Sequence, residues 1–260
     1  TQMKAFILAG GYGTRISEYT DVVPKPLVEV GCKPIILWIM ENYAAQGVKD
    51  FVILGGYKIE AIRAYFANFF VKNIDYTIDL ATGDLTSLSS GSARDWRVTV
   101  IDTGLDSNTG ARLKKAYEFF KFEKEGFFLT YGDGLSDVNI WNVKACAESN
   151  GSVMAMTAVH PPARFGELVV NANGVVASFE EKPQLSQGYI NGGFFYVRPE
   201  VIHYLDDDML ERTAMTTLAR DGLLSAYQHD GFWMCMDTKR DHSRLSEYIT
   251  AGMIPWLVKS

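Results

Sequence analysis

Cysteine is scarce in this chain and shows no pairing pattern. Its three cysteines, Cys32, Cys146 and Cys235, are odd in number and widely separated among 260 residues. A secreted disulfide scaffold normally has an even set of cysteines at short spacings, so this class of protein is excluded. The pattern instead favours a reducing compartment.

Long apolar runs and a basic stripe are also missing. No apolar run approaches the roughly 20 residues of a membrane-spanning helix, and no charged-then-apolar leader is present. Acidic residues outnumber basic ones by 31 to 25, and no lysine and arginine stripe suits a nucleic-acid backbone. We therefore expect a soluble, cytoplasmic protein that has neither a membrane nor a nucleic-acid partner.

Strand-like and helix-like segments alternate through the first 150 residues. Expected strands lie at 4–9, 50–54, 76–80, 98–101 and 127–131, and expected helices at 34–46, 58–70, 111–122 and 138–149. This β-α-β-α order predicts an α/β fold with a mostly parallel central sheet and helices on both faces. Ligands in such sheets bind beyond the carboxyl ends of the strands.

The second part of the chain has a different pattern. Strands are expected at 153–159, 168–170, 175–180 and 189–197, then two helices, strands at 224–228 and 232–236, and a helix from about 239. Asn173-Gly174 is a hairpin signal between the second and third of these strands. Residues 81–95 are polar and aperiodic, which predicts a long surface loop.

A glycine-rich segment follows the first expected strand. Ala9-Gly10-Gly11-Tyr12-Gly13-Thr14-Arg15 combines glycines, which let backbone N–H groups converge on an anion, with a hydroxyl and a guanidinium. It is not a P-loop, since Gly-Lys-Ser/Thr is absent, and Ile16 stands where a dinucleotide fingerprint needs glycine. A plain strand-to-helix turn is the alternative interpretation.

A lysine between two prolines comes about ten residues later. In Pro24-Lys25-Pro26 the prolines restrict the backbone, so Lys25 is carried on a stiff segment. A cation held in this way can stabilise charge that develops on a phosphate. An exposed lysine on a proline-rich loop is the simpler alternative, which the neighbouring glycine segment disfavours.

These motifs together resemble the sugar-phosphate nucleotidyltransferase family, whose hallmark is Gly-Gly-x-Gly-Thr-Arg followed by Pro-Lys-Pro. The resemblance continues through Gly132-Asp133, Glu180-Glu181-Lys182-Pro183, Ile190-Asn191-Gly192-Gly193 and Met236-Asp237-Thr238, in the expected order. Within the family it is strongest to the cytidylyltransferases that act on glucose 1-phosphate. The resemblance implies a Rossmann-like, GT-A-like fold and the formation of CDP-glucose and pyrophosphate from CTP and glucose 1-phosphate.

The resemblance also implies roles for individual residues. CTP would contact Leu8, Ala9, Gly10, Gly11, Tyr12, Gly13, Thr14, Arg15, Lys25, Ser107, Gly110, Arg112 and Gly132. The sugar phosphate would contact Glu181, Lys182, Asn191 and Gly192. Catalysis would rest on Arg15, Lys25, Asp133 and Asp237.

The pairing of Asp133 with Asp237 as ligands of Mg²⁺ is likewise implied by the resemblance. Mg²⁺ prefers a few carboxylates together with phosphate oxygens and water, and two aspartates and two phosphates meet that demand. The sugar phosphate oxygen is already ionised at neutral pH, so no general base is needed. Catalysis then consists of in-line positioning and neutralisation of charge.

The resemblance implies one unit over residues 1–260, with a nucleotide-binding half at about 1–150 and a sugar-phosphate-binding half at about 151–260. We also expect a homo-oligomer, because the family tends toward oligomers. Departures from the family pattern occur at Ala111 and at Thr213-Ala214-Met215, near the base and substrate pockets. The open alternatives are the same chemistry with dTTP, UTP or GTP or another phosphorylated acceptor, a GT-A-like glycosyltransferase, and a catalytically silent binding subunit.

Overall fold

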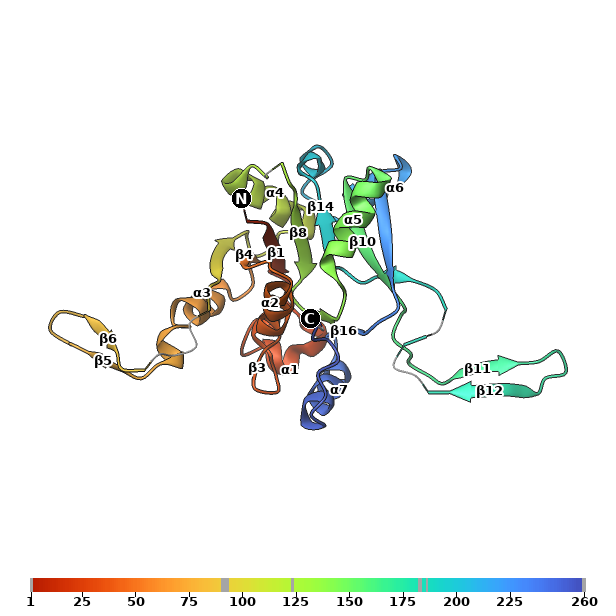
Figure 1. Cartoon of the computed structure of the whole chain (residues 1–260), viewed down its shortest axis with the longest axis horizontal. Coiled ribbons are helices and arrows are strands. Elements are labelled where there is room, and N and C mark those ends of the chain that lie inside the picture. The colour runs from red at the N-terminus through yellow and green to blue at the C-terminus, as the bar shows by residue number, and fades with distance from the viewer. Residues whose placement is uncertain (1, 90–93, 123, 182–183, 186, 259–260) are drawn as a thin grey trace.

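The structure is a computed structural model that describes residues 2–89, 94–122, 124–181, 184–185 and 187–258. Within these residues eight strands form a mixed central sheet (Figure 1). Its strands are β1 (Lys4–Ala9), β4 (Asp50–Gly55), β7 (Arg97–Asp102), β8 (Phe127–Tyr131), β10 (Met154–Val159), β13 (Ile190–Asn191), β14 (Phe195–Val197) and β15 (Leu224–His229).

The sheet has a parallel part and an antiparallel part. Strands β7, β4, β1 and β8 lie side by side in that order and are parallel. On the far side of β8, β14 is antiparallel to β8, β10 is antiparallel to β14, and β15 runs parallel to β10. The predicted α/β fold with a mostly parallel sheet and flanking helices is confirmed.

Helices cover both faces of the sheet, as the side-chain alternation of β1 requires. Ile7 faces a core shared with α2, α5 and α7, whereas Phe6 faces a second core shared with α4 and α6. The helices are α1 (Ser17–Thr20), α2 (Ile35–Ala45), α3 (Ile59–Ala67), α4 (Thr109–Phe120), α5 (Ile140–Asn150), α6 (Ala214–Arg220) and α7 (Lys239–Thr250), with short 3-10 turns at Thr14–Ile16, Lys25–Leu27, Val71–Asn73 and Pro199–His203.

Two hairpins extend from opposite sides of this body as arms (Figure 1). One consists of β5 (Tyr76–Ile78) and β6 (Leu85–Ser87), and the other of β11 (Glu167–Val170) and β12 (Val176–Glu180). Smaller strand pairs join β2 (Glu29–Val30) to β3 (Lys33–Pro34) and β9 (Gly134–Ser136) to β16 (Trp233–Cys235).

Two expectations from the sequence are wrong. The expected surface loop at 81–95 contains a strand in its described part, because Leu85–Ser87 pairs with β5 around a turn in which Gly83 has φ +82°. The expected strand 189–197 is divided into β13 and β14, because Gly193 (φ +76°) and Phe194 (φ +48°) adopt left-handed backbone conformations that interrupt an extended strand.

The residues after α7 complete one of the two cores. Trp256 is fully buried and meets Trp38 edge to face at 5.5 Å between ring centroids. The buried Asn42 of α2 donates from Nδ2 to the carbonyl oxygens of Trp256 (2.5 Å) and Ser136 (3.0 Å). No described helix has the combination of length and apolar content needed to cross a bilayer.

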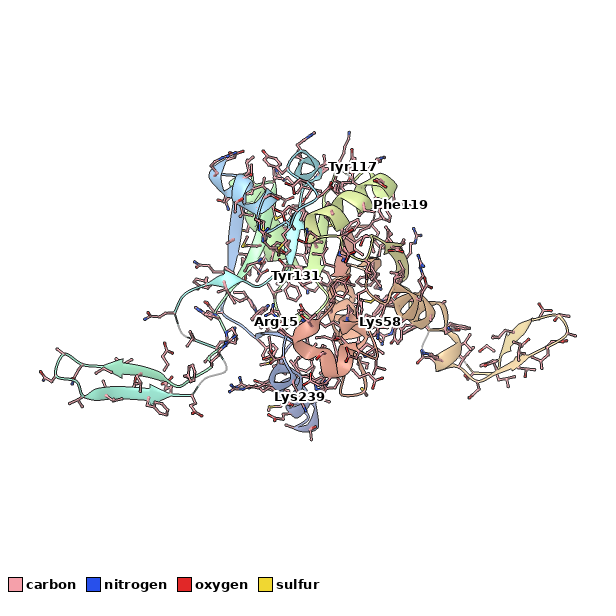
Figure 2. All side chains as sticks on the ribbon, turned by 180° about the vertical axis from the view of Figure 1, so that it is seen from behind. Arg15, Lys58, Tyr117, Phe119, Tyr131 and Lys239 are labelled. Carbon is pink, nitrogen blue, oxygen red and sulfur yellow. The ribbon has the colours of Figure 1, made fainter. Side chains whose placement is uncertain are left out.

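Replacing Trp256 with alanine should lower the free energy of unfolding by about 3–5 kcal/mol, because it empties a fully buried aromatic site. Phe119→Ala is the matched control, since Phe119 is 63% exposed at the rim of α4 (Figure 2), and it should change stability by less than about 0.5 kcal/mol. Urea unfolding followed by circular dichroism measures both, and equal losses would contradict the role of Trp256.

Candidate active site

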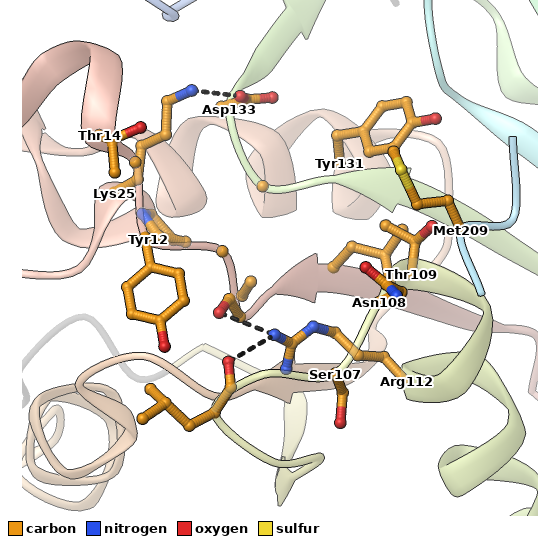
Figure 3. A pocket seen from close by; sticks show the side chains of 18 of the residues that line it. Tyr12, Thr14, Lys25, Ser107, Asn108, Thr109, Arg112, Tyr131, Asp133 and Met209 are labelled. Carbon is orange, nitrogen blue, oxygen red and sulfur yellow. Dashed lines mark hydrogen bonds and ion pairs between the residues drawn. The ribbon is translucent and has the colours of Figure 1, made fainter. Parts of the chain in front are cut away.

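A pocket of about 480 Å³ opens at the carboxyl ends of β1, β7 and β8 (Figure 3). This volume suits a small molecule, and the place is where α/β sheets bind ligands. Its walls come from three stretches of chain that the sheet brings together, together with Met209 and Asp237. These stretches are Leu8–Arg15 with Lys25 and Pro26, Leu105–Thr109 with Arg112, and Tyr131–Asp133.

The glycine-rich segment leaves β1 and turns back at Gly13. Gly13 has φ +64°, and a β-carbon there would lie 2.8 Å from the methyl carbon of Thr20. The Thr20 hydroxyl donates to the Gly13 carbonyl oxygen at 3.0 Å, which fastens the turn to α1. Glycine at this position is therefore required both by the backbone conformation and by the space available.

Arg112 of α4 lies beneath the loop and holds it in place. Its guanidinium donates to the carbonyl oxygens of Gly10 (2.9 Å), Gly55 (3.2 Å) and Gly104 (2.8 Å), and to the Thr103 hydroxyl (2.7 Å). Figure 3 shows the guanidinium directed at backbone oxygens. The ends of β1, β4 and β7 are thereby tied to one side chain.

The positive charge of Arg112 lacks a direct counter-charge. The residue is 3% exposed, and among the described residues no carboxylate is within ion-pair distance of it. Burial lowers the pKa of Arg112, while the more distant Asp102 and Asp106 act in the opposite direction. Arginine stays protonated in proteins, so this wall of the pocket carries a fixed positive charge that favours an anionic ligand.

Four charged residues gather at the other end of the pocket; we call Arg15, Lys25, Asp133 and Asp237 the charge cluster. Lys25 Nζ lies 2.7 Å from Asp133 Oδ2 and 3.1 Å from Asp237 Oδ1. Arg15 forms an ion pair with Asp237 and is 76% exposed, so its guanidinium is accessible to a ligand. The cluster therefore has two positive and two negative charges.

The surroundings fix the protonation of two groups in this region. Burial alone would lower the pKa of Lys25, but the charge of Asp133 and its hydrogen bond outweigh burial and raise the pKa above its ordinary value. Burial also raises the pKa of the neighbouring Cys235 thiol, and the charge of Asp133 adds to this effect. Lys25 is thus a cation at neutral pH and Cys235 a neutral thiol.

The donor set of the charge cluster fits a hard divalent cation. Asp133 and Asp237 approach one and the same cation, Lys25 Nζ, from two sides, so their carboxylates already converge on a positive charge. Carboxylate oxygens of this kind are the ligands that Mg²⁺ prefers. Within the described chain, no group of three or more His, Cys, Asp and Glu side chains could hold a metal by itself.

Most of the expected site residues meet in this pocket, and their roles stay predictions. All the expected nucleotide-binding and catalytic residues line it except Gly110, whose N–H donates to the Asp208 carbonyl oxygen at 3.1 Å. Glu181 is exposed at the root of the β11–β12 arm, and neither it nor Asn191 or Gly192 is a wall residue. Lys182 lies outside the described residues.

Tyr12 was expected as part of the glycine segment, whereas several other wall residues had no sequence motif to reveal them. Tyr12 donates from its hydroxyl to Asp106 Oδ1 at 2.6 Å, which links the glycine segment to the loop after β7. Met209 and Tyr131 close another side of the pocket (Figure 3). Only the position of Tyr131, at the end of an expected strand, could have indicated it.

Comparison with known proteins places this geometry in a family. A family described as "Nucleotidyl transferase" matches residues 4–239. The chain is 45% identical to the glucose-1-phosphate cytidylyltransferase of Salmonella typhimurium, covering 98% of both proteins. It is 39% identical to a probable glucose-1-phosphate cytidylyltransferase of Bacillus subtilis, covering 98% of this chain and 100% of that one.

The fold has a counterpart among solved structures. HddC from Yersinia pseudotuberculosis superposes with a TM-score of 0.63 at 21% identity, covering 95% of this chain and 100% of that one, which supports the fold alone. The family match and the two relatives extend over nearly the whole chain, including every residue of the charge cluster. The chain belongs to the nucleotidyl transferase family.

Proposed function

We propose that the protein transfers CMP from CTP to glucose 1-phosphate or a related sugar 1-phosphate, giving a CDP-sugar and pyrophosphate. The observation that carries the proposal is the charge cluster, which puts two cations and two carboxylates at one end of a nucleotide-sized pocket. The choice of CTP and glucose 1-phosphate is supported by 45% identity to an enzyme named for that reaction.

The two ends of the pocket suit different parts of the substrates. The glycine segment and Arg112 offer positive charge and a tight backbone turn, which suit the nucleotide and its phosphates. Asp133 follows β8, and strands β14, β10 and β13 lie on the opposite side of β8 from β1, β4 and β7. We therefore assign the nucleotide to the half at about 1–150 and the sugar phosphate to the half at about 151–260.

The reaction is an in-line displacement at the α-phosphorus. An oxygen of the sugar phosphate forms the new bond to the α-phosphorus, and the bond from that phosphorus to the oxygen bridging to the β-phosphate breaks. That bridging oxygen keeps the electron pair and leaves with pyrophosphate. Lys25 stabilises negative charge at the α-phosphate, and the exposed Arg15 holds the departing β- and γ-phosphates.

Asp133 and Asp237 would hold Mg²⁺ in this scheme. The bound ion would supply charge neutralisation between two anions that must approach each other. Lys25 contributes a fixed positive charge, because it sits on the 3-10 turn Lys25–Leu27 with Pro26 inside that turn. Proton transfer is not required of any residue, since the attacking oxygen is already ionised at neutral pH.

We also propose that the enzyme is a cytoplasmic homo-oligomer. Its cysteines are free, and the β11–β12 arm exposes more than half of Leu168, Val169 and Phe179. An isolated two-stranded hairpin is marginally stable in water, so apolar strands of this kind gain from being covered. Light scattering reads the mass directly, and a monomer at working concentrations would contradict this assignment.

Pyrophosphate release with Mg²⁺ should be highest for CTP with glucose 1-phosphate when CTP, ATP, GTP, UTP and dTTP are each tested against a panel of sugar 1-phosphates. Release with another pair would retain the reaction and replace the substrates. No release with any pair would refute transfer to sugar 1-phosphates.

In the same assay, Asp133→Asn and Asp237→Asn should each reduce kcat by at least about 100-fold, because each removes one charge from the charge cluster. Asp221→Asn is the matched control, since Asp221 pairs with Arg220 on the surface and should leave kcat within about twofold. Wild-type kcat in both cluster variants would exclude them from catalysis.

Arg112→Lys should raise the KM for CTP by about 10- to 100-fold. A lysine has three donors on one nitrogen and cannot reach the separate acceptors that the guanidinium now serves. The exposed Arg63→Lys is the control and should leave KM unchanged. Steady-state kinetics gives KM and kcat separately, and an unaltered KM in Arg112→Lys would show that the loop keeps its shape without this side chain.

A further inference from the structure

Three half-buried side chains meet beside the pocket, outside the charge cluster; we call Tyr131, Asn191 and Glu211 the Tyr–Asn–Glu cluster. They come from the end of β8, from β13 and from the connection before α6. Tyr131 donates from its hydroxyl to Glu211 Oε1 at 2.5 Å, and Asn191 donates from Nδ2 to the Tyr131 hydroxyl oxygen at 3.2 Å.

The orientation of the Asn191 amide is determined by its own backbone. The N–H of Gly193 donates to Asn191 Oδ1 at 2.9 Å, so the oxygen of the amide faces Gly193. The amide nitrogen must then face Tyr131. One of its two N–H groups is used by the phenol oxygen, and the other is left to donate elsewhere.

The orientation of the Glu211 carboxylate is determined in the same way. Thr109 Oγ1 accepts the N–H of Leu210 at 2.8 Å and therefore directs its own proton to Glu211 Oε2, also at 2.8 Å. Oε1 accepts the hydrogen bond that the Tyr131 hydroxyl donates. Both carboxylate oxygens thus act as acceptors, and in the described part of the chain no lysine, arginine or histidine pairs with Glu211.

These directions fix what the phenol oxygen offers a ligand. Its single proton is committed to Glu211, and one lone pair accepts from Asn191. The remaining lone pair is an acceptor, and the spare N–H of Asn191 next to it is a donor. A hydroxyl group is the small group that donates to the first and accepts from the second at the same time.

The ring of Tyr131 is held so that this arrangement persists. Phe195 meets it edge to face at 5.6 Å, and a β-carbon on Gly193 would lie 2.9 Å from the ring. Burial raises the pKa of Tyr131, and the charge of Glu211 raises it further, so the phenol keeps its proton at any working pH. The acceptor and donor are therefore preformed.

The position of the Tyr–Asn–Glu cluster indicates which substrate it meets. Tyr131 stands two residues before Asp133, on the side of the sheet where β14, β10 and β13 follow β8. Arg112 and the glycine segment occupy the opposite side, toward β4 and β7. Under the proposed division of the pocket, a ligand group that lies beyond Asp133 toward β13 belongs to the acceptor.

We propose that the Tyr–Asn–Glu cluster selects the acceptor by recognising one ring hydroxyl of the sugar, with Glu211 as a positioning residue that commits the Tyr131 proton. This inference rests on the proposed function, and it names the residues that recognise the acceptor sugar. Removing the recognised hydroxyl leaves the phenol lone pair and the amide N–H without partners, which disfavours the deoxy sugar.

The test measures kcat/KM for glucose 1-phosphate and for its 2-, 3-, 4- and 6-deoxy analogues with CTP and Mg²⁺. In the wild-type enzyme one analogue should lose at least about 100-fold relative to the parent sugar. Tyr131→Phe removes the acceptor oxygen. Glu211→Leu removes the carboxylate that accepts from the Tyr131 hydroxyl, so the phenol O–H is free to rotate. For that analogue, each variant should reduce the ratio of kcat/KM for glucose 1-phosphate to kcat/KM for the analogue to below about 10. The same ratio for the other three analogues, and the KM for CTP, should be unchanged.

A combined Tyr131→Phe/Glu211→Leu variant distinguishes positioning from structural support. If Glu211 acts through Tyr131, the double variant should give the same ratio as Tyr131→Phe alone, because the hydroxyl that Glu211 orients is already absent. Glu118→Gln on the exposed face of α4 is the control and should retain the wild-type ratios. Tyr131→Phe keeps the ring packing, so the test does not depend on Glu211→Leu folding.

The possible outcomes separate this inference from the function beneath it. Wild-type ratios in both single variants, or an equal change for all four analogues, would overturn the role of the Tyr–Asn–Glu cluster while leaving cytidylyl transfer intact. A change in the KM for CTP alone would overturn it as well, by assigning these residues to the nucleotide. No turnover of any sugar phosphate by the wild-type enzyme would overturn both.

Discussion

The buried guanidinium of Arg112 is the interaction on which the pocket depends. It donates to backbone carbonyls at the ends of β1, β4 and β7, so one side chain reinforces the direct contacts between these strand ends, such as the Thr103 N–H with the Gly55 carbonyl oxygen. A charged donor at these carbonyls gives the bottom of the pocket a fixed geometry and a positive charge before any ligand arrives.

In the charge cluster, by contrast with Arg112, a buried cation has direct carboxylate partners. Lys25 is mostly buried, and its desolvation is offset because Asp133 and Asp237 both lie within ion-pair distance. The same carboxylates are the groups available to a divalent cation. The two carboxylates and two cations of the charge cluster thus neutralise one another in this structure.

The sequence predicted the helices and strands of the body well, because their hydrophobic periodicity is strong. Strands β1 and β8 fall at the expected residues. In the β5–β6 arm, β5 lies within the expected strand 76–80, but β6 escaped prediction because it is only three residues long and exposed, which leaves no alternation to detect. The prediction of one strand at 189–197 was wrong because Gly193 and Phe194 have left-handed conformations, which the sequence pattern does not reveal. The strand that follows them pairs with β10 and β8.

For the site, motifs identified the residues with chemistry but not those that orient them. The glycine segment and Lys25 have local patterns with a physical meaning, whereas the approach of Asp133 to Asp237 follows only from the fold. Arg112 was expected to touch the nucleotide, and its hydrogen bonds to the backbone of three loops were not foreseeable. Contacts such as Tyr131 with Glu211 link distant segments by single hydrogen bonds, which leave no periodic trace.

The space occupied by the Arg112 guanidinium also limits which residues can replace its glycine neighbours. A β-carbon on Gly10 would overlap the guanidinium, and one on Gly56 would meet both the guanidinium and the Gly104 carbonyl oxygen. A larger residue at Gly10 therefore requires the guanidinium to move, and one at Gly56 requires the Gly104 backbone to move as well. Substitutions at Gly10, Gly56 and Arg112 should therefore affect one another's stability cost and not be additive.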